Sequence, residues 1–212
     1  MAAIALYTGL RPGELRALTW ADVDLVARTI SVSKALDAQT GDVKAPKTAQ
    51  GQRVIPIQPN LLPLLVAAAP DEGDDLSGLV LGEIVASEDH LAQAFRDHLD
   101  AAGVDRPRLT ADNDTEEPID FRSLRDTHAT WLALGGVADK VIQRRMGHAS
   151  PATTDKYVKA AETFAAEHVG TPFPPLPAAL STRLRPNKSR NPSFRRGSSV
   201  ARVGFEPTTF GL

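Results

Sequence analysis

Short apolar segments that stop at glycine limit this chain to small helical building blocks. The clearest are residues 1–7, 123–134 and Asp139–Met146, which are followed by Thr8-Gly9, by Gly135-Gly136 and by Gly147. Glycine adopts the left-handed backbone conformation that closes a helix at low steric cost. Each segment is therefore predicted to be one short helix, and tight turns are predicted between the elements.

Four further helices are predicted from capping residues and apolar spacing. They begin near Pro12, after Asn60, at about Ser87 and at Ser150-Pro151. Ser150 can cap the last of these helices and Pro151 suits its first turn, so it should run to about His168. The helix from residue 87 carries Leu91 and Phe95 at a spacing that buries one face.

Two stretches alternate between apolar and polar residues, as strands do. Residues 29–33 alternate around Ile30 and Val32, and residues 52–57 alternate again. We expect a second strand and a second turn within residues 44–51, between these two stretches. The predicted fold class is α+β, mainly α-helical, with a small three-stranded antiparallel sheet near the N-terminus.

The net charge of −2 hides an uneven distribution along the chain. Residues 1–70 and 121–170 each carry a net +2, residues 71–120 carry −12, and residues 171–212 carry +6. The acidic stretch therefore lies between two mildly basic blocks. Residues 171–212 are rich in Pro, Ser and Arg without periodicity, which is typical of a disordered tail. We expect a catalytic or binding domain in residues 1–170 and a basic tail in 171–212.

Several classes of protein are disfavoured by missing residues and motifs. The chain has no cysteine, which excludes disulfides, thiolate metal ligands and cysteine nucleophiles. Its five histidines form no HExxH, and neither GxSxG nor a glycine-rich nucleotide loop occurs. No apolar run approaches the roughly 20 residues that span a bilayer, and no secretion signal opens the chain. We expect a cytoplasmic protein that uses no metal and no cofactor.

Basic residues stand beside the predicted helix ends. Arg11 precedes a helix N-terminus, where backbone N–H groups favour an anion. Arg122 and Arg125 are three residues apart and share a helix face. A forked guanidinium binds two phosphate oxygens at once. The remaining candidates are Lys47 in a hairpin turn, His148 as a donor and Tyr157 as a hydroxyl. Together these groups could cleave a phosphodiester without a metal.

The order of these motifs resembles the catalytic domain of the tyrosine recombinases, the phage integrase family. The motifs are, in chain order, TGLRPGEL (8–15) with LTW (18–20), PKT (46–48) with RVIP (53–56), LRDTHAT (124–130), and MGHAS (146–150) followed by Tyr157. Each motif is weak alone, and their weight comes from the shared order and spacing. The resemblance covers nearly all of residues 1–165, with the acidic stretch as variable filler.

The resemblance implies a site-specific recombinase that cleaves and rejoins DNA without metal or ATP. Tyr157 matches the nucleophile that forms a 3′-phosphotyrosyl link and releases a 5′-hydroxyl. Arg11 and Arg125 match the two arginines that clamp the phosphate and stabilise the transition state. Lys47 matches the lysine that protonates the leaving oxygen. His148 matches a hydrogen-bonding position, and Glu14 matches an acidic residue that orients Arg11.

One position departs from the family pattern. Where the family usually has His or Lys, three residues before the second arginine, this chain has Arg122. An arginine binds phosphate but does not shuttle a proton, since its pKa exceeds about 12. His128 could compensate, but we favour a packing role for it.

The resemblance also implies partners and leaves alternatives open. The expected partners are double-stranded DNA at attachment sites and further copies of the chain in a synaptic tetramer, with no membrane. The family's N-terminal DNA-clasping domain does not fit before Met1, so we expect an N-terminally truncated catalytic domain with weak, salt-sensitive DNA binding. The alternatives are a catalytically impaired DNA-binding remnant and a generic helical regulator, in which the motif residues would lie far apart.

The tail holds a separate clue. Residues 204–207, Gly-Phe-Glu-Pro, can be encoded by a sequence that resembles the T-arm of a tRNA gene, and integrase genes of this type often abut such sites. The final residues are thus either a translation of attachment-site DNA or an unrelated basic tail.

Overall fold

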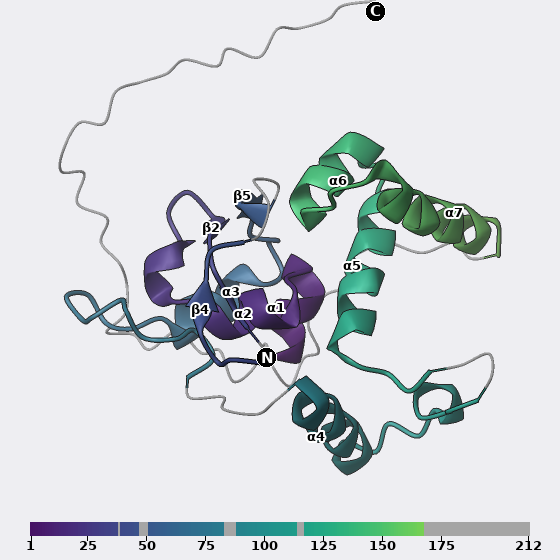
Figure 1. Ribbon diagram of the computed structural model, residues 1–212, viewed down its shortest axis with the longest axis horizontal. Helices are drawn as coiled ribbons and strands as arrows, with labels where there is room; N and C mark the ends of the chain where they lie inside the picture. Colours follow the sequence, from purple (N-terminus) through teal and green to yellow (C-terminus); the bar gives the residue numbers. More distant parts are fainter. Residues whose placement is uncertain (38, 47–50, 83–87, 114–116, 168–212) are drawn as a thin grey trace, which may run out of the picture.

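Helix α5 (Phe121–Leu134) runs between two groups of elements in the computed structural model, which describes residues 1–37, 39–46, 51–82, 88–113 and 117–167. On one side lie the short N-terminal helices and the strands, and on the other lie α6 and α7 (Figure 1). The remaining helices are α1 (Ala2–Thr8), α2 (Pro12–Ala17), α3 (Leu62–Ala68), α4 (Glu88–Ala101), α6 (Asp139–Met146) and α7 (Pro151–Glu167). Single 3₁₀ turns span Trp20–Asp22 and Pro107–Leu109. The mainly helical α+β fold is confirmed.

The helix boundaries follow the caps in the sequence, with two differences. Helix α5 begins two residues earlier than predicted, because the Asp120 carboxylate accepts the backbone N–H of Ser123 at 2.7 Å and caps the helix. Helix α3 has Leu61 rather than Asn60 as its N-cap, with a proline in its first turn. The predicted cap at Ser87 lies outside the described residues. Helix α7 begins at Pro151 as predicted and continues to Glu167.

The three-stranded antiparallel sheet is present, but its strands differ from the prediction. Its order is β1 (Val23–Asp24), β2 (Thr29–Val32) and β5 (Arg53–Pro56), with Ile30 directly opposite Ile55. The expected middle strand within residues 44–51 was wrong. The strand β4 (Val43–Lys44) pairs instead with β3 (Ala35–Leu36) in a separate two-stranded sheet, because a tight turn, in which the Asp37 N–H donates to the carbonyl oxygen of Asp42, joins these two strands.

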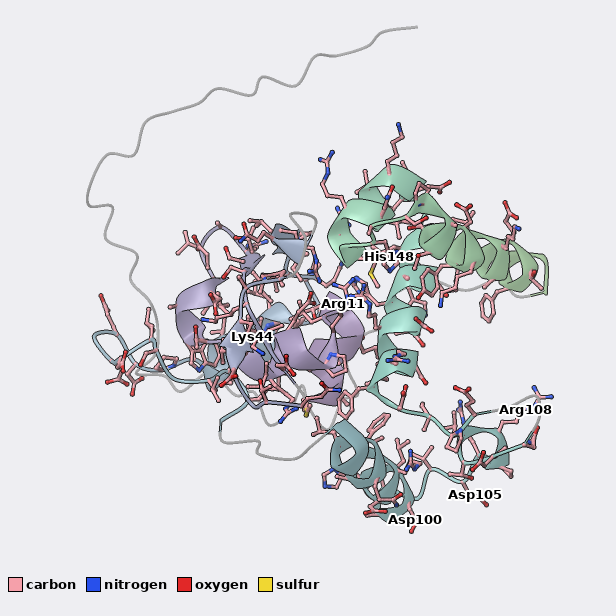
Figure 2. The ribbon with its side chains drawn as sticks, in the orientation of Figure 1. Arg11, Lys44, Asp100, Asp105, Arg108 and His148 are labelled. Atoms are coloured by element: carbon pink, nitrogen blue, oxygen red, sulfur yellow. The ribbon has the colours of Figure 1, made fainter. Side chains whose placement is uncertain are left out.

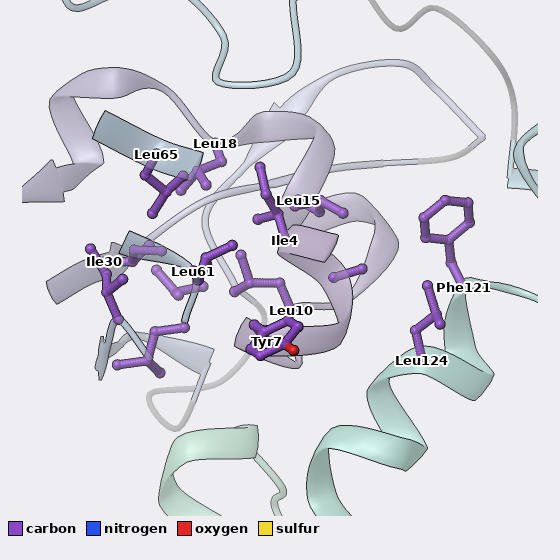
Figure 3. Packing of buried hydrophobic residues seen from close by; sticks show 14 of the residues in the cluster. Ile4, Tyr7, Leu10, Leu15, Leu18, Ile30, Leu61, Leu65, Phe121 and Leu124 are labelled. Atoms are coloured by element: carbon purple, nitrogen blue, oxygen red, sulfur yellow. The ribbon is translucent and has the colours of Figure 1, made fainter. Parts of the chain in front are cut away.

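Two apolar clusters meet on helix α5. The larger one joins α1, α2, β2 and α3 to the first turns of α5, as Figure 3 shows. Its labelled members are Ile4, Tyr7, Leu10, Leu15, Leu18, Ile30, Leu61, Leu65, Phe121 and Leu124. The smaller cluster joins α5 to α6 and α7 through Ala129, Leu132, Ile142, Met146 and Tyr157. Because α5 belongs to both clusters, side chains along it are held in place from two sides.

The turn after α1 brings that helix into direct contact with α5. Gly9 adopts a left-handed conformation with φ of 65°, and a Cβ at this position would lie 2.6 Å from Cδ2 of His128. The His128 ring is buried, and its Nδ1 lies 2.9 Å from the carbonyl oxygen of Leu6. Burial lowers the pKa of His128 to about 4. The packing role predicted for His128 is confirmed.

Among the described residues, no helix is both long enough and apolar enough to cross a bilayer. In the same part of the chain, no three His, Asp or Glu side chains are grouped so that they could hold a metal ion.

Candidate functional site

A pocket of about 620 Å³ gathers the residues that the sequence singled out. Six of the seven predicted site residues line it: Arg11, Glu14, Arg122, Arg125, His148 and Tyr157. The seventh, Lys47, lies outside the described residues. Its neighbour Pro46 and the nearby Gly51 line the pocket. Residues from α2, α5 and α7 thus meet around one cavity.

Arg125 is the most deeply buried cation of this pocket. It projects from α5, is only 5% exposed, and donates one N–H to the carbonyl oxygen of Gly9 at 2.5 Å and another to that of Met146. Burial, followed by repulsion from Arg11, lowers its pKa to about 10. The guanidinium therefore keeps its charge at neutral pH.

Arg11 caps helix α2 and reaches across to the end of α6. Its Nη2 donates to the carbonyl oxygen of Gly147 at 2.7 Å, and its Nη1 donates to Oε1 of Glu14 at 2.9 Å. The side chain is 43% exposed, so part of the guanidinium faces the pocket opening. Figure 2 shows Arg11 and His148 close together between the two groups of elements.

Glu14 is a buried carboxylate held by two arginines. It accepts the backbone N–H and Nη1 of Arg11, both at 2.9 Å, and both terminal nitrogens of Arg53 at 2.8 Å. Burial alone raises the pKa of Glu14, but the hydrogen bonds and charge of Arg53, together with those of Arg11, outweigh this effect and hold the pKa below its ordinary value. The predicted contact between Glu14 and Arg11 is present.

Arg53 was missed as a site residue by the sequence reasoning. Its side chain is 3% exposed, and besides Glu14 it binds the carbonyl oxygen of Arg145 through Nε at 2.7 Å. The alternation of residues along this strand could have identified Arg53. Arg53 falls on the same face as the buried Ile55, and a charged residue on a buried face requires a partner of opposite charge.

The carbonyl groups at the C-terminal end of α6 accept hydrogen bonds from three arginines of this region. Arg53, Arg125 and Arg11 donate to the carbonyl oxygens of residues 145, 146 and 147, in that order. The final carbonyls of a helix have no partner within the helix and carry partial negative charge. Gly147 then turns the chain with φ of 65° and directs the following residue, His148, into the pocket. One helix end thus positions three cations and a histidine.

His148 lies between this helix end and α7. Its ring stacks on Tyr157 with the centroids 5.7 Å apart and the planes inclined by 19°, and its Nδ1 lies 3.0 Å from the Thr154 hydroxyl. Burial, and then the charges of Arg125 and Arg11, lower its pKa to about 4. His148 is therefore neutral at neutral pH. In the tautomer whose Nδ1 accepts the Thr154 hydroxyl, the ring proton is on Nε2, where it can serve as a hydrogen-bond donor.

Tyr157 has a buried ring and a hydroxyl at the pocket wall. The ring belongs to the smaller apolar cluster, while the hydroxyl donates to Oδ1 of Asp126 on α5. Lys156 lies 4.5 Å from the ring centroid. Burial and the hydrogen bond to Asp126 raise the pKa of Tyr157 above its ordinary value. In this state the nucleophile candidate is a neutral phenol.

Asp126 and Lys156 line the same pocket and were also missed. Neither had a signal in the sequence, because their contacts with Tyr157 depend on how α5 packs against α7. Arg122 lines the pocket as predicted and is exposed on α5. A generic helical regulator was expected to have Arg11, Lys47, Arg125, His148 and Tyr157 far apart. This expectation is wrong for the four of these residues that the structure describes, because they line one pocket.

A second, larger pocket of about 1000 Å³ lies beside β1 and α3. Its rim carries Asp22, Asp24, Asp71, Glu72 and Asp74. So many carboxylates repel a phosphate. Farther along the acidic stretch, Asp100 and Asp105 lie well away from Arg11 and His148 (Figure 2). These carboxylates thus lie apart from the basic pocket, whose own lining includes Glu14 and Asp126.

Residues 1–163 match the sequence model of the phage integrase family. A tyrosine recombinase XerC-like protein of Caldanaerobacter subterraneus subsp. tengcongensis is 27% identical over 177 residues, covering 71% of this chain and 42% of that protein. The ICEBs1 integrase of Bacillus subtilis is 29% identical over 156 residues, covering 71% of this chain and 41% of its own length. The chain therefore spans about two fifths of these relatives.

Similar folds occur among solved structures. The Tn1549 transposon integrase in complex with transposon right end DNA has a TM-score of 0.55 and 24% identity, over 79% of this chain and 58% of that one. The same integrase in complex with circular intermediate DNA has a TM-score of 0.55 and 25% identity, over 78% of this chain and 58% of that one. XerA recombinase has a TM-score of 0.52 and 23% identity, over 79% of this chain and 55% of that one. These likenesses support the fold described above.

Proposed function

Because the chain belongs to the phage integrase family, we propose that it is a site-specific DNA recombinase that cleaves and rejoins DNA strands through a 3′-phosphotyrosyl link to Tyr157. One observation carries the proposal: Tyr157 shares a single basic pocket with Arg11, Arg125 and His148. The relatives' names point the same way, since the solved transposon integrase is bound to DNA. We propose double-stranded DNA as the partner of this pocket.

The two arginines would hold the scissile phosphate and stabilise its transition state. A guanidinium has five N–H donors in a planar fork, and the carbonyl contacts of Arg11 and Arg125 use only some of them. The helix end that binds both side chains orients them before DNA arrives. Groups that are oriented in advance stabilise developing charge without reorganisation during the reaction. A pentavalent phosphate in this pocket would gain charge next to two fixed cations.

His148 and Lys47 would complete the chemistry. A neutral His148 with its proton on Nε2 can donate a hydrogen bond to a non-bridging phosphate oxygen. Lys47 follows Pro46, which lines the pocket, and we propose that it protonates the leaving 5′ oxygen. Arg122 would add a third cation for the phosphate without transferring a proton. Glu14, held by Arg53, would keep Arg11 in its binding orientation.

We extend the proposal to the organisation of the chain. Residues 1–170 would form the catalytic domain, and residues 171–212 a basic tail outside it. Recombination joins two DNA sites, so several copies of the chain would act together on DNA. The alternative is a chain that binds DNA without cutting it, and the experiment below separates the two.

The experiment is a covalent trap on nicked DNA. Nicked fragments of the genome that encodes this chain are incubated with the protein at low salt, because a nick near the cleavage site releases a short strand and stops religation. We expect protein–DNA adducts that survive detergent and disappear in Tyr157→Phe. Tyr7→Phe is the matched control, since the chain has two tyrosines and Tyr7 lies in the apolar core. DNA binding without any adduct in the unsubstituted protein would establish the DNA-binding alternative and refute the proposed function.

A further inference from the structure

The hydroxyl of Tyr157 has a specific partner in the DNA-free state. It donates a hydrogen bond to Oδ1 of Asp126, which lies on α5 directly after Arg125. Asp126 Oδ2 lies 3.8 Å from the Lys156 ammonium, which in turn lies over the Tyr157 ring. These groups form a small polar cluster where α5 packs against α7, and all of them line the basic pocket.

A carboxylate is out of place in a pocket that binds phosphate. It repels the anion that Arg11 and Arg125 attract, so its presence weakens binding unless it serves another purpose. A purely structural role is a weak explanation, because the ring of Tyr157 is already fixed by Ile142, Met146 and the other members of the smaller apolar cluster. The Asp126 side chain is also 42% exposed, and a hydrogen bond so close to solvent adds little stability.

We propose that Asp126 is a further catalytic residue, whose carboxylate takes the proton of the Tyr157 hydroxyl while the tyrosine oxygen attacks the DNA phosphate. The inference rests on the proposed function and adds to it the proton acceptor for the nucleophile. A tyrosine hydroxyl is a poor nucleophile until it loses its proton, which makes an acceptor in contact with it valuable.

The step balances in atoms and charge. The bond from the tyrosine oxygen to phosphorus forms, the bond from phosphorus to the 5′ oxygen breaks, and the phosphate remains a singly charged diester. The tyrosine proton moves to Oδ1 of Asp126, and the leaving oxygen receives a proton from the general acid, for which Lys47 is proposed. In the reverse step, the 5′-hydroxyl of a strand attacks phosphorus and gives its proton to the group that served as the acid, for which Lys47 is proposed. Protonated Asp126 returns its proton to the tyrosine oxygen as the bond from that oxygen to phosphorus breaks.

The other charged and titratable groups around the hydroxyl are poorer acceptors. His148 stacks on the Tyr157 ring, and its Nδ1 lies against Thr154, so neither of these contacts involves the hydroxyl. Lys156 and Arg125 are cations with no lone pair to offer when charged. Arg122, on the same face of α5, has the same limitation. Within the described part of the pocket, Asp126 is the acceptor whose contact with the hydroxyl is in place.

The same contact keeps the resting enzyme inactive. Burial and the hydrogen bond to Asp126 both raise the pKa of Tyr157, so the phenol stays neutral until a phosphate binds. A bound phosphate places the electrophile next to the oxygen, and bond formation then makes the proton acidic. Asp126 thus holds the proton at rest and receives it during attack.

The test is the Asp126→Asn variant on the nicked DNA that traps the unsubstituted protein. An asparagine amide keeps the shape and an oxygen acceptor but is a far weaker base. We expect single-turnover cleavage to slow by about 100-fold or more, which is the usual contribution of general base catalysis. We also expect the remaining rate to rise steeply with pH, because only the ionised tyrosine then reacts. Asp126→Glu should recover part of the rate. Asp155→Asn, an exposed position on α7, is the matched control and should cleave normally.

A spectroscopic measurement separates proton transfer from a loss of structure. In a Tyr7→Phe background, Tyr157 is the only tyrosine, and its ionisation can be followed by ultraviolet absorbance. We expect Asp126→Asn to lower the pKa of Tyr157, because a negative acceptor near the phenolate is removed. Noncovalent DNA binding should stay equal or tighten.

The outcomes distinguish this inference from the proposed function. If the unsubstituted protein forms no adduct, the proposed function fails. If it forms the adduct and Asp126→Asn does so at the same rate with the same pH profile, Asp126 is not the proton acceptor and the proposed function stands. A slow variant whose rate keeps the original pH profile would also overturn the inference, because that result indicates a structural defect.

Discussion

The carboxylate of Glu14 accepts hydrogen bonds from both terminal nitrogens of Arg53 at 2.8 Å, and both side chains are almost completely buried. This pair ties β5 to helix α2, which carries Arg11 at its start. Arg11, which is proposed to bind the phosphate, is therefore held by a buried ion pair that belongs to the fold.

Replacing Arg53 should be strongly destabilising. Arg53→Met leaves Glu14 buried with only Arg11 as its partner, and breaking a buried pair costs about 3–5 kcal/mol. Urea unfolding followed by circular dichroism measures the change in the free energy of unfolding. Arg106→Met, at an exposed position in the acidic stretch, should change it by less than about 0.5 kcal/mol. Equal effects of the two substitutions would show that the Arg53–Glu14 pair does not hold the fold.

Gly9 is required for two reasons that a matched pair of variants separates. Gly9→Ala places a side chain at φ of 65° and brings its Cβ within 2.6 Å of His128. Gly136→Ala has a similar φ of 72°, but nothing lies within 4 Å of its Cβ. Gly136→Ala should lower the free energy of unfolding by about 1 kcal/mol through backbone strain alone. Gly9→Ala should lower it by clearly more, because its methyl group also meets His128. Similar losses in thermal unfolding would mean that α5 shifts to accommodate the methyl group.

Stability should fall as the solution becomes mildly acidic. The pKa of His128 lies at about 4 in the folded protein and near 6.5 when unfolded. Below pH 6.5 the unfolded chain binds a proton that folded His128 refuses, so the free energy of unfolding decreases as pH falls toward 4, by up to about 1.4 kcal/mol per pH unit. His148 acts in the same direction, with its pKa also near 4. Urea unfolding of His128→Gln at several pH values should show a shallower decrease. An unchanged slope would refute the assignment.

Arg122 occupies a position where the family usually has a proton-transferring residue. Arg122→Ala should slow DNA cleavage by roughly 10–100-fold through lost phosphate contacts. Arg122→His should cleave faster than Arg122→Ala and should gain a pH dependence near 6.5, because histidine can both bind phosphate and exchange a proton. Single-turnover rates on nicked DNA measure both effects. Equal rates for the two variants would mean that the residue at position 122 does not act on the phosphate.

The helices were predictable because the residues at each helix end determine where the helix begins or stops. Gly9 and Gly147 close α1 and α6 in the expected left-handed conformation, and Pro151 begins α7 where the sequence placed it. The strand pairing was not predictable, because β1 has only two residues and alternation cannot be read in so short a segment. The partner of β4 was set by a tight turn through Asp37, whose N–H binds the carbonyl oxygen of Asp42.

The candidate site was also predictable only in part. The motifs identified Arg11, Arg125, His148 and Tyr157, because their spacing survives in the sequence and all four line one pocket. Their hydrogen-bond partners were hidden, because they come from elsewhere in the fold. The three carbonyl groups at the end of α6 have no side-chain signature, and Asp126 meets Tyr157 only because α5 packs on α7.

Tyr157 is proposed to supply the nucleophilic oxygen that links the protein to DNA. The most direct measurement is mass spectrometry of the trapped adduct after digestion with trypsin and nuclease. We predict a nucleotide remnant on the tryptic peptide that contains Tyr157, attached through a 3′ phosphate. A remnant on another residue, or attachment through a 5′ phosphate, would show that Tyr157 does not form the proposed 3′-phosphotyrosyl link.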